Sequence, residues 1–244
     1  MRTIGVIPAR WGSTRLPGKS LVDICGKPLI QWVVEAVRRA EKIDDLIVAT
    51  DHERIKEKVE AIGEKAVMTR PDHHSGTDRI AEAIEGIDAE VVINIQGDEP
   101  LIEPGLIDEL AELMVNSESW DMATAAVKID DESEITNPSV VKVVWDDQHR
   151  ALYFSRSVIP FVRDPADGGA SYWRHLGIYA YRRDFLEQIV KVPPCELELA
   201  EKLEQLRALH MGARIAVVET LDSGMGVDTP EDVKIVEMII SSRK

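Results

Sequence analysis

A cationic loop follows the first apolar segment of the chain. Residues 8–20 read Pro-Ala-Arg-Trp-Gly-Ser-Thr-Arg-Leu-Pro-Gly-Lys-Ser, so that Arg10, Arg15 and Lys19 supply positive charge and Ser13 supplies a hydroxyl group. The P-loop pattern G-x-x-x-x-G-K-[ST] does not fit, because its first glycine would fall on Ser13. Glycine still lets the backbone approach a ligand closely. We therefore predict a phosphate-binding loop of another kind, with a solvated basic loop as the alternative.

A second polar loop, residues 70–79, lies between a strand predicted at residues 66–68 and a helix predicted to begin near residues 75–77. The free N–H groups at a helix N-terminus suit an anion or another acceptor. His73 and His74 could suggest a metal site, but adjacent histidines on a loop rarely bind one ion together, and no third His or Cys is near them in sequence. We interpret this segment as a loop that reads a base or a ribose.

Two carboxylates stand where Mg²⁺ could bind. Asp98 comes shortly after the most apolar predicted strand, residues 91–95, and Asp228 shortly precedes the last predicted helix. Carboxylates at such positions suit a hard cation that bridges to phosphate oxygens. For Asp228, the alternative is a turn or capping residue. Glu99, which follows Asp98, could simply be the acid at a helix N-terminus.

The second half of the chain carries residues that could bind a second substrate. An arginine such as Arg156 could hold a carboxylate in bidentate fashion, with a surface salt bridge as the alternative. His175 could be a ligand contact or an ordinary structural histidine. Glu201 and Gln205 are spaced i, i+4 on a helix predicted at residues 197–209. They lie away from its leucine face, Leu199, Leu203 and Leu206, where a solvated face is the simpler interpretation.

Apolar runs alternate with amphipathic segments through the first half of the chain, and this alternation must position those residues. Short apolar strands are predicted at residues 4–7, 46–49, 91–95 and 122–127, and helices at residues 29–40, 53–62, 77–87 and 105–115. Such alternation predicts an α/β fold with a doubly wound, mostly parallel sheet. Ligands bind such sheets beyond the carboxyl ends of the strands, where the loops described above lie.

The pattern changes after about residue 128. A hairpin is predicted from residues 140–145 and 150–154, followed by strands at 176–181 and 214–218 and a closing helix at 230–240 with Thr229 as N-cap. No linker composition separates the halves. We expect one domain, residues 1–244, in which about residues 128–180 form a small β-rich insertion and a possible dimer contact.

Composition limits the class of function. The chain has 29 Lys plus Arg against 44 Asp plus Glu, a net charge of −15, yet residues 1–22 contain four cations and no acid. The acidic balance argues against binding to duplex nucleic acid or to an anionic membrane surface, and the local cations suggest a small anion. Two cysteines far apart fit reduced thiols in the cytoplasm. We see no signal peptide and no apolar run long enough to span a membrane.

Taken together, these segments resemble the 3-deoxy-manno-octulosonate cytidylyltransferase (CMP-Kdo synthetase) family over essentially the whole chain. The first loop is shared with other sugar-activating enzymes, and the later motifs narrow the sugar. Two departures are Trp11, where Tyr is common, and Ser20, where Pro is common. The matching motifs are residues 8–19, 49–51, 74–77, Asn-Ile-Gln-Gly-Asp-Glu-Pro at 94–100, Tyr-Phe-Ser-Arg at 153–156, His-Leu-Gly-Ile-Tyr at 175–179, Leu-Glu-Gln-Leu-Arg at 203–207 and Gly-Val-Asp-Thr-Pro-Glu-Asp at 226–232.

The resemblance implies a fold like that of nucleotide-diphospho-sugar transferases and a cytoplasmic homodimer that makes CMP-Kdo and pyrophosphate from CTP and Kdo with Mg²⁺. It implies catalytic roles for Arg10, Lys19, Asp98 and Asp228, with the two aspartates as metal ligands. CTP would be bound by Arg10, Ser13, Arg15, Lys19, Arg70, Asp72, Ser75, Gly76 and Arg79. The sugar acid would be bound by Gln96, Arg156, His175, Tyr179, Glu201 and Gln205, and Glu204 could substitute for either of the last two.

Three alternatives to this activity stay open. The same chemistry could act on another sugar acid, such as 8-amino-Kdo, a sialic acid or pseudaminic acid. The nucleotide could be one other than CTP. The chain could also be a catalytically inactive nucleotide-binding protein, although the presence of Arg10, Lys19, Asp98 and Asp228 argues against this.

Overall fold

The structure is a computed structural model that describes residues 1–13, 15–73, 75–164, 169–222 and 224–242. The strands are β1 (Thr3–Ala9), β2 (Asp23–Ile24), β3 (Lys27–Pro28), β4 (Asp45–Thr50), β5 (Lys65–Met68), β6 (Val91–Asn94), β7 (Met122–Lys128), β8 (Lys142–Trp145), β9 (Ala151–Ser155), β10 (Trp173–Arg182) and β11 (Ile215–Thr220). The helices are the 3₁₀ turn η1 (Lys19–Leu21), α1 (Leu29–Val37), α2 (Glu53–Ala61), α3 (Gly76–Ala83), α4 (Pro104–Asn116), α5 (Glu132–Thr136), α6 (Arg183–Ile189), α7 (Glu196–Glu201), α8 (Gln205–His210) and α9 (Pro230–Ser242).

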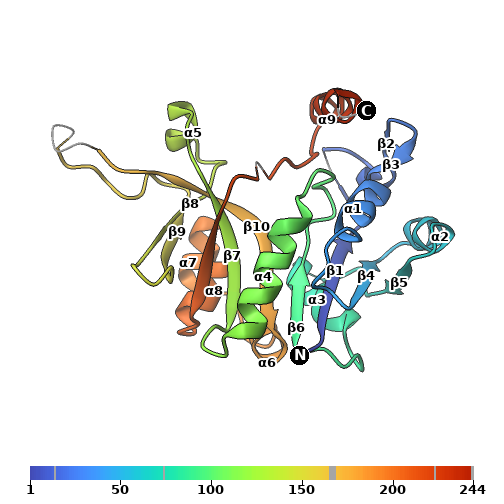
Figure 1. Ribbon diagram of the computed structural model, residues 1–244, viewed down its shortest axis with the longest axis horizontal. Helices are drawn as coiled ribbons and strands as arrows, with labels where there is room; N and C mark the ends of the chain where they lie inside the picture. The colour runs from blue at the N-terminus through green and yellow to red at the C-terminus, as the bar shows by residue number, and fades with distance from the viewer. Residues whose placement is uncertain (14, 74, 165–168, 223, 243–244) are drawn as a thin grey trace.

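The central sheet has the strand order β11-β7-β10-β6-β1-β4-β5 (Figure 1). β1 pairs in parallel with β4 and β6, β4 with β5, and β7 with β11. β10 runs antiparallel to both of its neighbours, β6 and β7. The prediction of a mostly parallel α/β sheet is therefore confirmed, and the reversed direction of β10 within this order is what the sequence pattern did not reveal.

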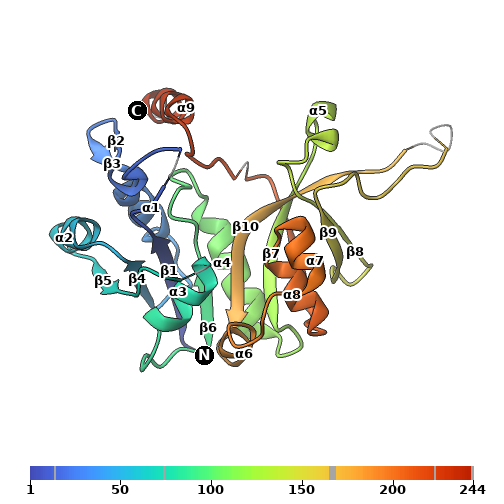
Figure 2. The ribbon, with the colours of Figure 1, turned by 180° about the vertical axis from the view of Figure 1, so that it is seen from behind.

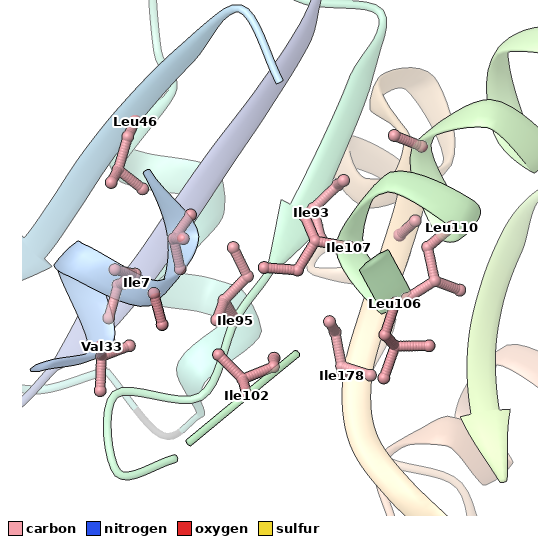
Figure 3. Packing of buried hydrophobic residues seen from close by; sticks show 14 of the residues in the cluster. Ile7, Val33, Leu46, Ile93, Ile95, Ile102, Leu106, Ile107, Leu110 and Ile178 are labelled. Carbon is pink, nitrogen blue, oxygen red and sulfur yellow. The ribbon is translucent and has the colours of Figure 1, made fainter. Parts of the chain in front are cut away.

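Helices cover both faces of the sheet, because successive side chains of its strands point to opposite sides. On β1, Ile7 packs into a cluster with α1, α2 and α4, whereas Val6 packs into a cluster with α3, α6 and α8. Figure 3 shows the first cluster, in which Ile7 and Val33 lie on one side and Ile107 and Leu110 of α4 on the other. This two-sided burial fixes the ends of the strands, where the candidate ligand residues lie.

The β-rich region forms an arm that branches from the start of β10, a strand inside the sheet. β8 and β9 make the predicted antiparallel hairpin, and Lys142 of β8 pairs with Arg174 at the start of β10. The arm and α5 extend away from the helices that flank β1 (Figures 1 and 2). The helices α5 and α6 were not predicted, because their five and seven residues are too short for a clear apolar period.

The helix predicted at residues 197–209 is wrong as a single helix. α7 ends at Glu201, Lys202 takes a left-handed conformation with φ 56°, and α8 begins at Gln205. Leu199, which was expected on the buried face, is 54% exposed, whereas Leu203 and Leu206 are buried. The break therefore sends the residues before and after Lys202 in different directions.

The closing helix α9 begins as predicted. The backbone N–H of Asp232 donates to the Thr229 hydroxyl, and the Thr229 N–H donates to the Asp232 carboxylate. This capping box makes the loop before α9 a defined structure. The loop carries Asp228 back across the sheet to the end of β6, where the Val227 N–H donates to the Asp98 carbonyl at 2.8 Å.

Candidate active site

A cavity of about 750 Å³ lies beyond the carboxyl ends of β1 and β6. This is the edge of the sheet where a parallel α/β fold was expected to bind its ligand. The cavity brings together residues that are far apart in the sequence. Those of the predicted set that line it are Arg10, Ser13, Arg15, Lys19, Ser75, Gly76, Arg79, Gln96, Asp98, Arg156 and Asp228.

Lys19 lies between the two carboxylates that were predicted to bind Mg²⁺. Its Nζ donates to Oδ2 of Asp98 at 2.5 Å and to Oδ1 of Asp228 at 2.9 Å. Arg15 donates to the other oxygen of Asp228 at 2.9 Å. Partial burial of Lys19 disfavours its charge, but the Asp98 charge and the hydrogen bonds that Lys19 donates to both carboxylates outweigh this effect and raise the pKa of Lys19. Both carboxylates therefore face one position at which a cation is stable.

The donor set fits a magnesium ion that is completed by substrate. Within the described residues, no group of three or more His, Cys, Asp or Glu side chains could hold a metal ion. Mg²⁺ is commonly held by one or two carboxylates together with waters and substrate phosphates. Asp98 and Asp228, which already share one ammonium group, are such a pair.

Gly97 is a functional residue that the sequence reasoning did not single out. A Cβ atom added to it would lie 2.7 Å from the carbonyl oxygen of Pro8 and 3.4 Å from Cγ2 of Ile7. Only glycine therefore lets the turn that carries Asp98 pass this close to the end of β1. The glycine immediately before the aspartate was the available signal in the sequence.

Arg79 lines the cavity, but its guanidinium is bonded to groups of the protein. It is 4% exposed, and its guanidinium donates to Asp51 at 3.0 Å and to the hydroxyl of Thr69 at 2.5 Å. The other oxygen of Asp51 accepts from the backbone N–H of Trp11 at 2.8 Å. This chain of contacts joins α3 to the ends of β4 and β5 and to the first loop, so Arg79 positions the loops around the cavity.

The second loop divides between two cavities. The helix begins where the sequence predicted, near residues 75–77: Ser75 is the N-cap of α3 and forms a capping box with Asp78. Arg70 and Asp72 do not line the main cavity but a neighbouring one of about 810 Å³, and His73 lines both. The Glu82 carboxylate accepts from the Arg70 backbone N–H and contacts Nε2 of His73. His74 lies outside the described residues.

A smaller pocket of about 190 Å³ adjoins the main cavity and shares Gln96 and Glu204 with it. The predicted residues Tyr179 and Gln205 line this pocket. Gln205 is 5% exposed, and its Nε2 has no hydrogen-bond partner among the described residues; the same holds for Oδ1 of Asn94. Buried polar atoms without partners are costly, so this pocket is suited to a ligand with hydroxyl groups.

Glu201 and Glu204 have different places in the structure. The Glu201 carboxylate accepts from the Ser155 hydroxyl at 2.6 Å and from the Arg156 backbone N–H at 2.9 Å, behind the cavity wall. Glu204 lines the cavity instead, and burial raises the pKa of its carboxyl. Because the helix breaks at Lys202, Glu204 reaches the cavity and Glu201 does not.

His175 does not supply positive charge. Burial lowers its pKa to about 3, and its Nε2 is 3.0 Å from the Thr124 hydroxyl. Its ring packs against Phe154 and Tyr179. Enclosure therefore keeps the imidazole neutral, and His175 does not add a second cation beside Arg156.

Comparison with known proteins decides the family. A family model for cytidylyltransferases matches residues 4–215. The 3-deoxy-manno-octulosonate cytidylyltransferase of Bdellovibrio bacteriovorus is 49% identical to this chain, over 100% of this chain and 99% of its own length. That of Geobacter sulfurreducens is 48% identical, over 98% and 100%. The chain belongs to the 3-deoxy-manno-octulosonate cytidylyltransferase family.

One solved structure agrees with membership of this family, and a more distant one shows the fold. A structure of CMP:2-keto-3-deoxy-manno-octonic acid synthetase complexed with CTP is 44% identical, covers both chains fully and superimposes with a TM-score of 0.96. A cytidylyltransferase from Leptospira borgpetersenii, 17% identical with a TM-score of 0.64 over 99% of this chain and 87% of its own, shares the fold. The family and fold predicted from the motifs are thus confirmed. Among the described residues, no helix is long and apolar enough to cross a membrane.

Proposed function

We propose that this chain is a 3-deoxy-manno-octulosonate cytidylyltransferase, which makes CMP-Kdo and pyrophosphate from CTP and 3-deoxy-D-manno-octulosonate (Kdo). CMP-Kdo is the activated sugar for lipopolysaccharide synthesis. The observation that carries the proposal is the cavity at the ends of β1 and β6, where a cationic loop, two carboxylates and a polar pocket meet. Family membership supplies the identity of the two substrates.

The reaction is an in-line displacement at phosphorus. The anomeric hydroxyl oxygen of the sugar forms a bond to the α-phosphorus of CTP, the bond from that phosphorus to the bridging oxygen breaks, and pyrophosphate leaves with the electron pair. The hydroxyl proton passes to solvent. Such transfers depend mainly on positioning and charge neutralisation, so no covalent intermediate with the protein is needed.

The residues of the first loop bind the triphosphate of CTP. Arg10 and Lys19 bind phosphate oxygens, and Ser13 and Arg15 complete the loop. Lys19 stabilises the negative charge that develops in the transition state. The nucleoside lies towards the second loop, where Ser75 and Gly76 line the same cavity and Arg79 fixes the loop through Asp51. Arg70 and Asp72 act from the outer side of this loop.

Asp98 and Asp228 would hold Mg²⁺, which when bound supplies charge neutralisation at the phosphates and lowers the pKa of a coordinated hydroxyl. The sugar acid occupies the side of the cavity opposite the first loop. Gln96, Tyr179 and Gln205 offer polar groups in the small pocket, and Arg156 offers a cation in the main cavity. Glu201 and His175 act from behind this wall, by holding the Arg156 turn and by packing against Tyr179.

One assay tests the activity directly. Pyrophosphate release should require CTP, Kdo and Mg²⁺ together, with CMP-Kdo as the second product by mass spectrometry. Parallel reactions replace CTP by ATP, GTP or UTP and replace Kdo by 8-amino-Kdo, a sialic acid or pseudaminic acid. Preference for another sugar acid or nucleotide would replace the proposed substrate. CTP binding without pyrophosphate release from any mixture would indicate an inactive nucleotide-binding protein.

We also propose that the chain is one domain that forms a cytoplasmic homodimer through about residues 128–180. The supporting observation is Phe161, which is 82% exposed on the arm between β9 and β10. CTP is a cytoplasmic nucleotide, and Cys25 and Cys195 are free thiols. Sedimentation of the full chain should give a dimer, and Phe161→Asp should shift it towards monomer. A monomeric wild-type protein would contradict the proposal.

A further inference from the structure

The ammonium group of Lys202 is a cation at the cavity that the predicted site did not include. Lys202 is exposed and lines both the main cavity and an adjoining cavity of about 500 Å³. Its side chain makes no hydrogen bond or ion pair with any described residue, whereas Lys19 and Arg15 on the opposite loop are bonded to Asp98 and Asp228. Its charge is therefore available to a ligand.

The backbone of Lys202 is fixed on both sides. Its N–H donates to the Glu198 carbonyl at 2.8 Å, and the neighbouring Glu201 carbonyl accepts from Nε of Arg156 at 2.7 Å. Leu203, the next residue, is only 6% exposed. A lysine with φ 56° is in a region that residues other than glycine rarely adopt. The side chain is thus presented from a defined point on the cavity wall, beside Arg156.

The charges around this wall favour an anion. The Arg156 guanidinium donates to two backbone carbonyls, of Glu201 and Pro138, and neutral carbonyls do not compensate its charge. Behind it, the Glu201 carboxylate and the buried Lys142 ammonium carry opposite charges. Among the described residues that line the main cavity, the acids are Asp98, Asp228 and Glu204. Asp98 and Asp228 bind Lys19, and burial raises the pKa of the Glu204 carboxyl, which favours its neutral form.

We propose that Lys202 is a specificity-determining residue that binds the carboxylate of the sugar acid together with Arg156. The inference rests on the proposed function. Lys202 and Arg156 come from the ends of α7 and β9, across the cavity from the first loop, and α8 immediately beyond Lys202 carries Gln205 into the small polar pocket. An acid held there by its carboxylate would have its hydroxyl groups beside Gln96 and Gln205.

The test is a set of variants in the CTP and Kdo assay. Lys202→Met removes the charge and keeps a long, unbranched side chain. Lys202→Gly removes the charge and suits the left-handed backbone. Both should raise KM for Kdo by about fivefold, the effect of a partly exposed ion pair, with kcat and KM for CTP unchanged. Lys202→Arg should restore the wild-type KM. Added salt should raise KM for Kdo less in Lys202→Met than in the wild type.

The matched control is Lys191→Met, because Lys191 is also exposed and lines the adjoining cavities but not the main one. It should leave both KM values unchanged. An unchanged KM for Kdo in both Lys202 variants, or a raised KM for CTP alone, would overturn the inference while leaving the proposed function intact. If the wild-type protein released no pyrophosphate from CTP with Kdo or another sugar acid, the proposed function would fail, and this inference with it.

Discussion

Replacing Gly97 by alanine tests whether the close approach of the two loops sets the position of Asp98. The added Cβ would lie 2.7 Å from the Pro8 carbonyl oxygen, a distance that real Cβ atoms essentially never show. The obstacle is backbone at the end of β1, where Pro8 and Ala9 pair with Ala49 and Thr50 of β4. The turn that carries Asp98 must therefore move by a few tenths of an ångström.

Two effects of that movement can be estimated. Overpacking of this kind costs about 1–3 kcal/mol of unfolding free energy, a part of the roughly 5–15 kcal/mol of an ordinary domain, so the variant should fold. Because the Asp98 carbonyl accepts from Val227, the shift also reaches the loop of Asp228. A misplacement of about 1 Å at a reacting centre can cost roughly 100-fold in rate, so we expect kcat to fall about tenfold or more.

The assay is pyrophosphate release together with thermal unfolding. At about 2–4 °C per kcal/mol for a chain of this size, Gly97→Ala should lower Tm by roughly 2–12 °C. The control is Gly105→Ala at the exposed start of α4, where an added Cβ meets no atom within 4 Å. That variant should keep wild-type kcat and gain up to about 1 kcal/mol from helix propensity. Wild-type kcat and Tm in Gly97→Ala would refute the reasoning.

Three further predictions concern charge. Asp98→Asn should reduce pyrophosphate release by about 100-fold or more while changing unfolding free energy by no more than about 1 kcal/mol, since its ion pair with Lys19 is partly exposed; near-normal kinetics with Mg²⁺ as the only metal would contradict it. Arg207→Met should cost about 3–5 kcal/mol in urea unfolding, because the Glu198 carboxylate would stay buried without the guanidinium that it binds at 2.6 and 2.8 Å; a cost below about 1 kcal/mol would be the opposing result. His175, whose pKa falls from 6.5 to about 3 on folding, stabilises the protein fully above pH 6.5, and this stability is lost as the pH falls towards 3. The free energy of unfolding measured in urea should therefore fall by up to about 1.4 kcal/mol for each pH unit over this range, and His175→Gln should make this dependence on pH weaker. Equal pH dependence in the variant and the wild type would exclude His175 as the cause.

Local patterns in the sequence were sufficient to predict most elements of the sheet. Burial on both faces of the sheet gives its strands continuous apolar runs, and burial on one face gives the helices their apolar spacing. The elements that lie within a few residues of their predicted places are β1, β4, β6, β7, α1, α2 and α4. The same reasoning located the ligand loops, because the end of a parallel strand fixes where the following residues go. The antiparallel placement of β10 between β6 and β7 depends on pairing over long sequence separations, which no local period reports.

The helix break at Lys202 could not be predicted from residue types. The residues from Glu196 to His210 are mostly good helix formers without glycine or proline, so propensity favours a single helix. Tertiary contacts decide otherwise. Leu203 and Leu206 must enter the core, and the buried pair of Arg207 with Glu198 ties α8 back onto α7. In the conformation that satisfies these contacts, Glu204 lines the cavity, and Glu201 lies behind its wall.

The cationic segment at the start of the chain looked like a single anion site, and the structure changes that interpretation. Two of its cations, Arg15 and Lys19, are bonded to Asp98 and Asp228, so Arg10 is the cation of the first loop with no ion pair among the described residues. Further positive charge comes from Arg156 and Lys202 on the opposite wall. A cavity with cations from both the first loop and the wall that carries Arg156 and Lys202, and with the Asp98 and Asp228 carboxylates bonded to cations of the first loop, suits two anionic substrates better than one. This division of charge is what a reaction between a nucleoside triphosphate and a sugar acid requires, because each anion needs its own counter-charge while the reacting atoms meet between them.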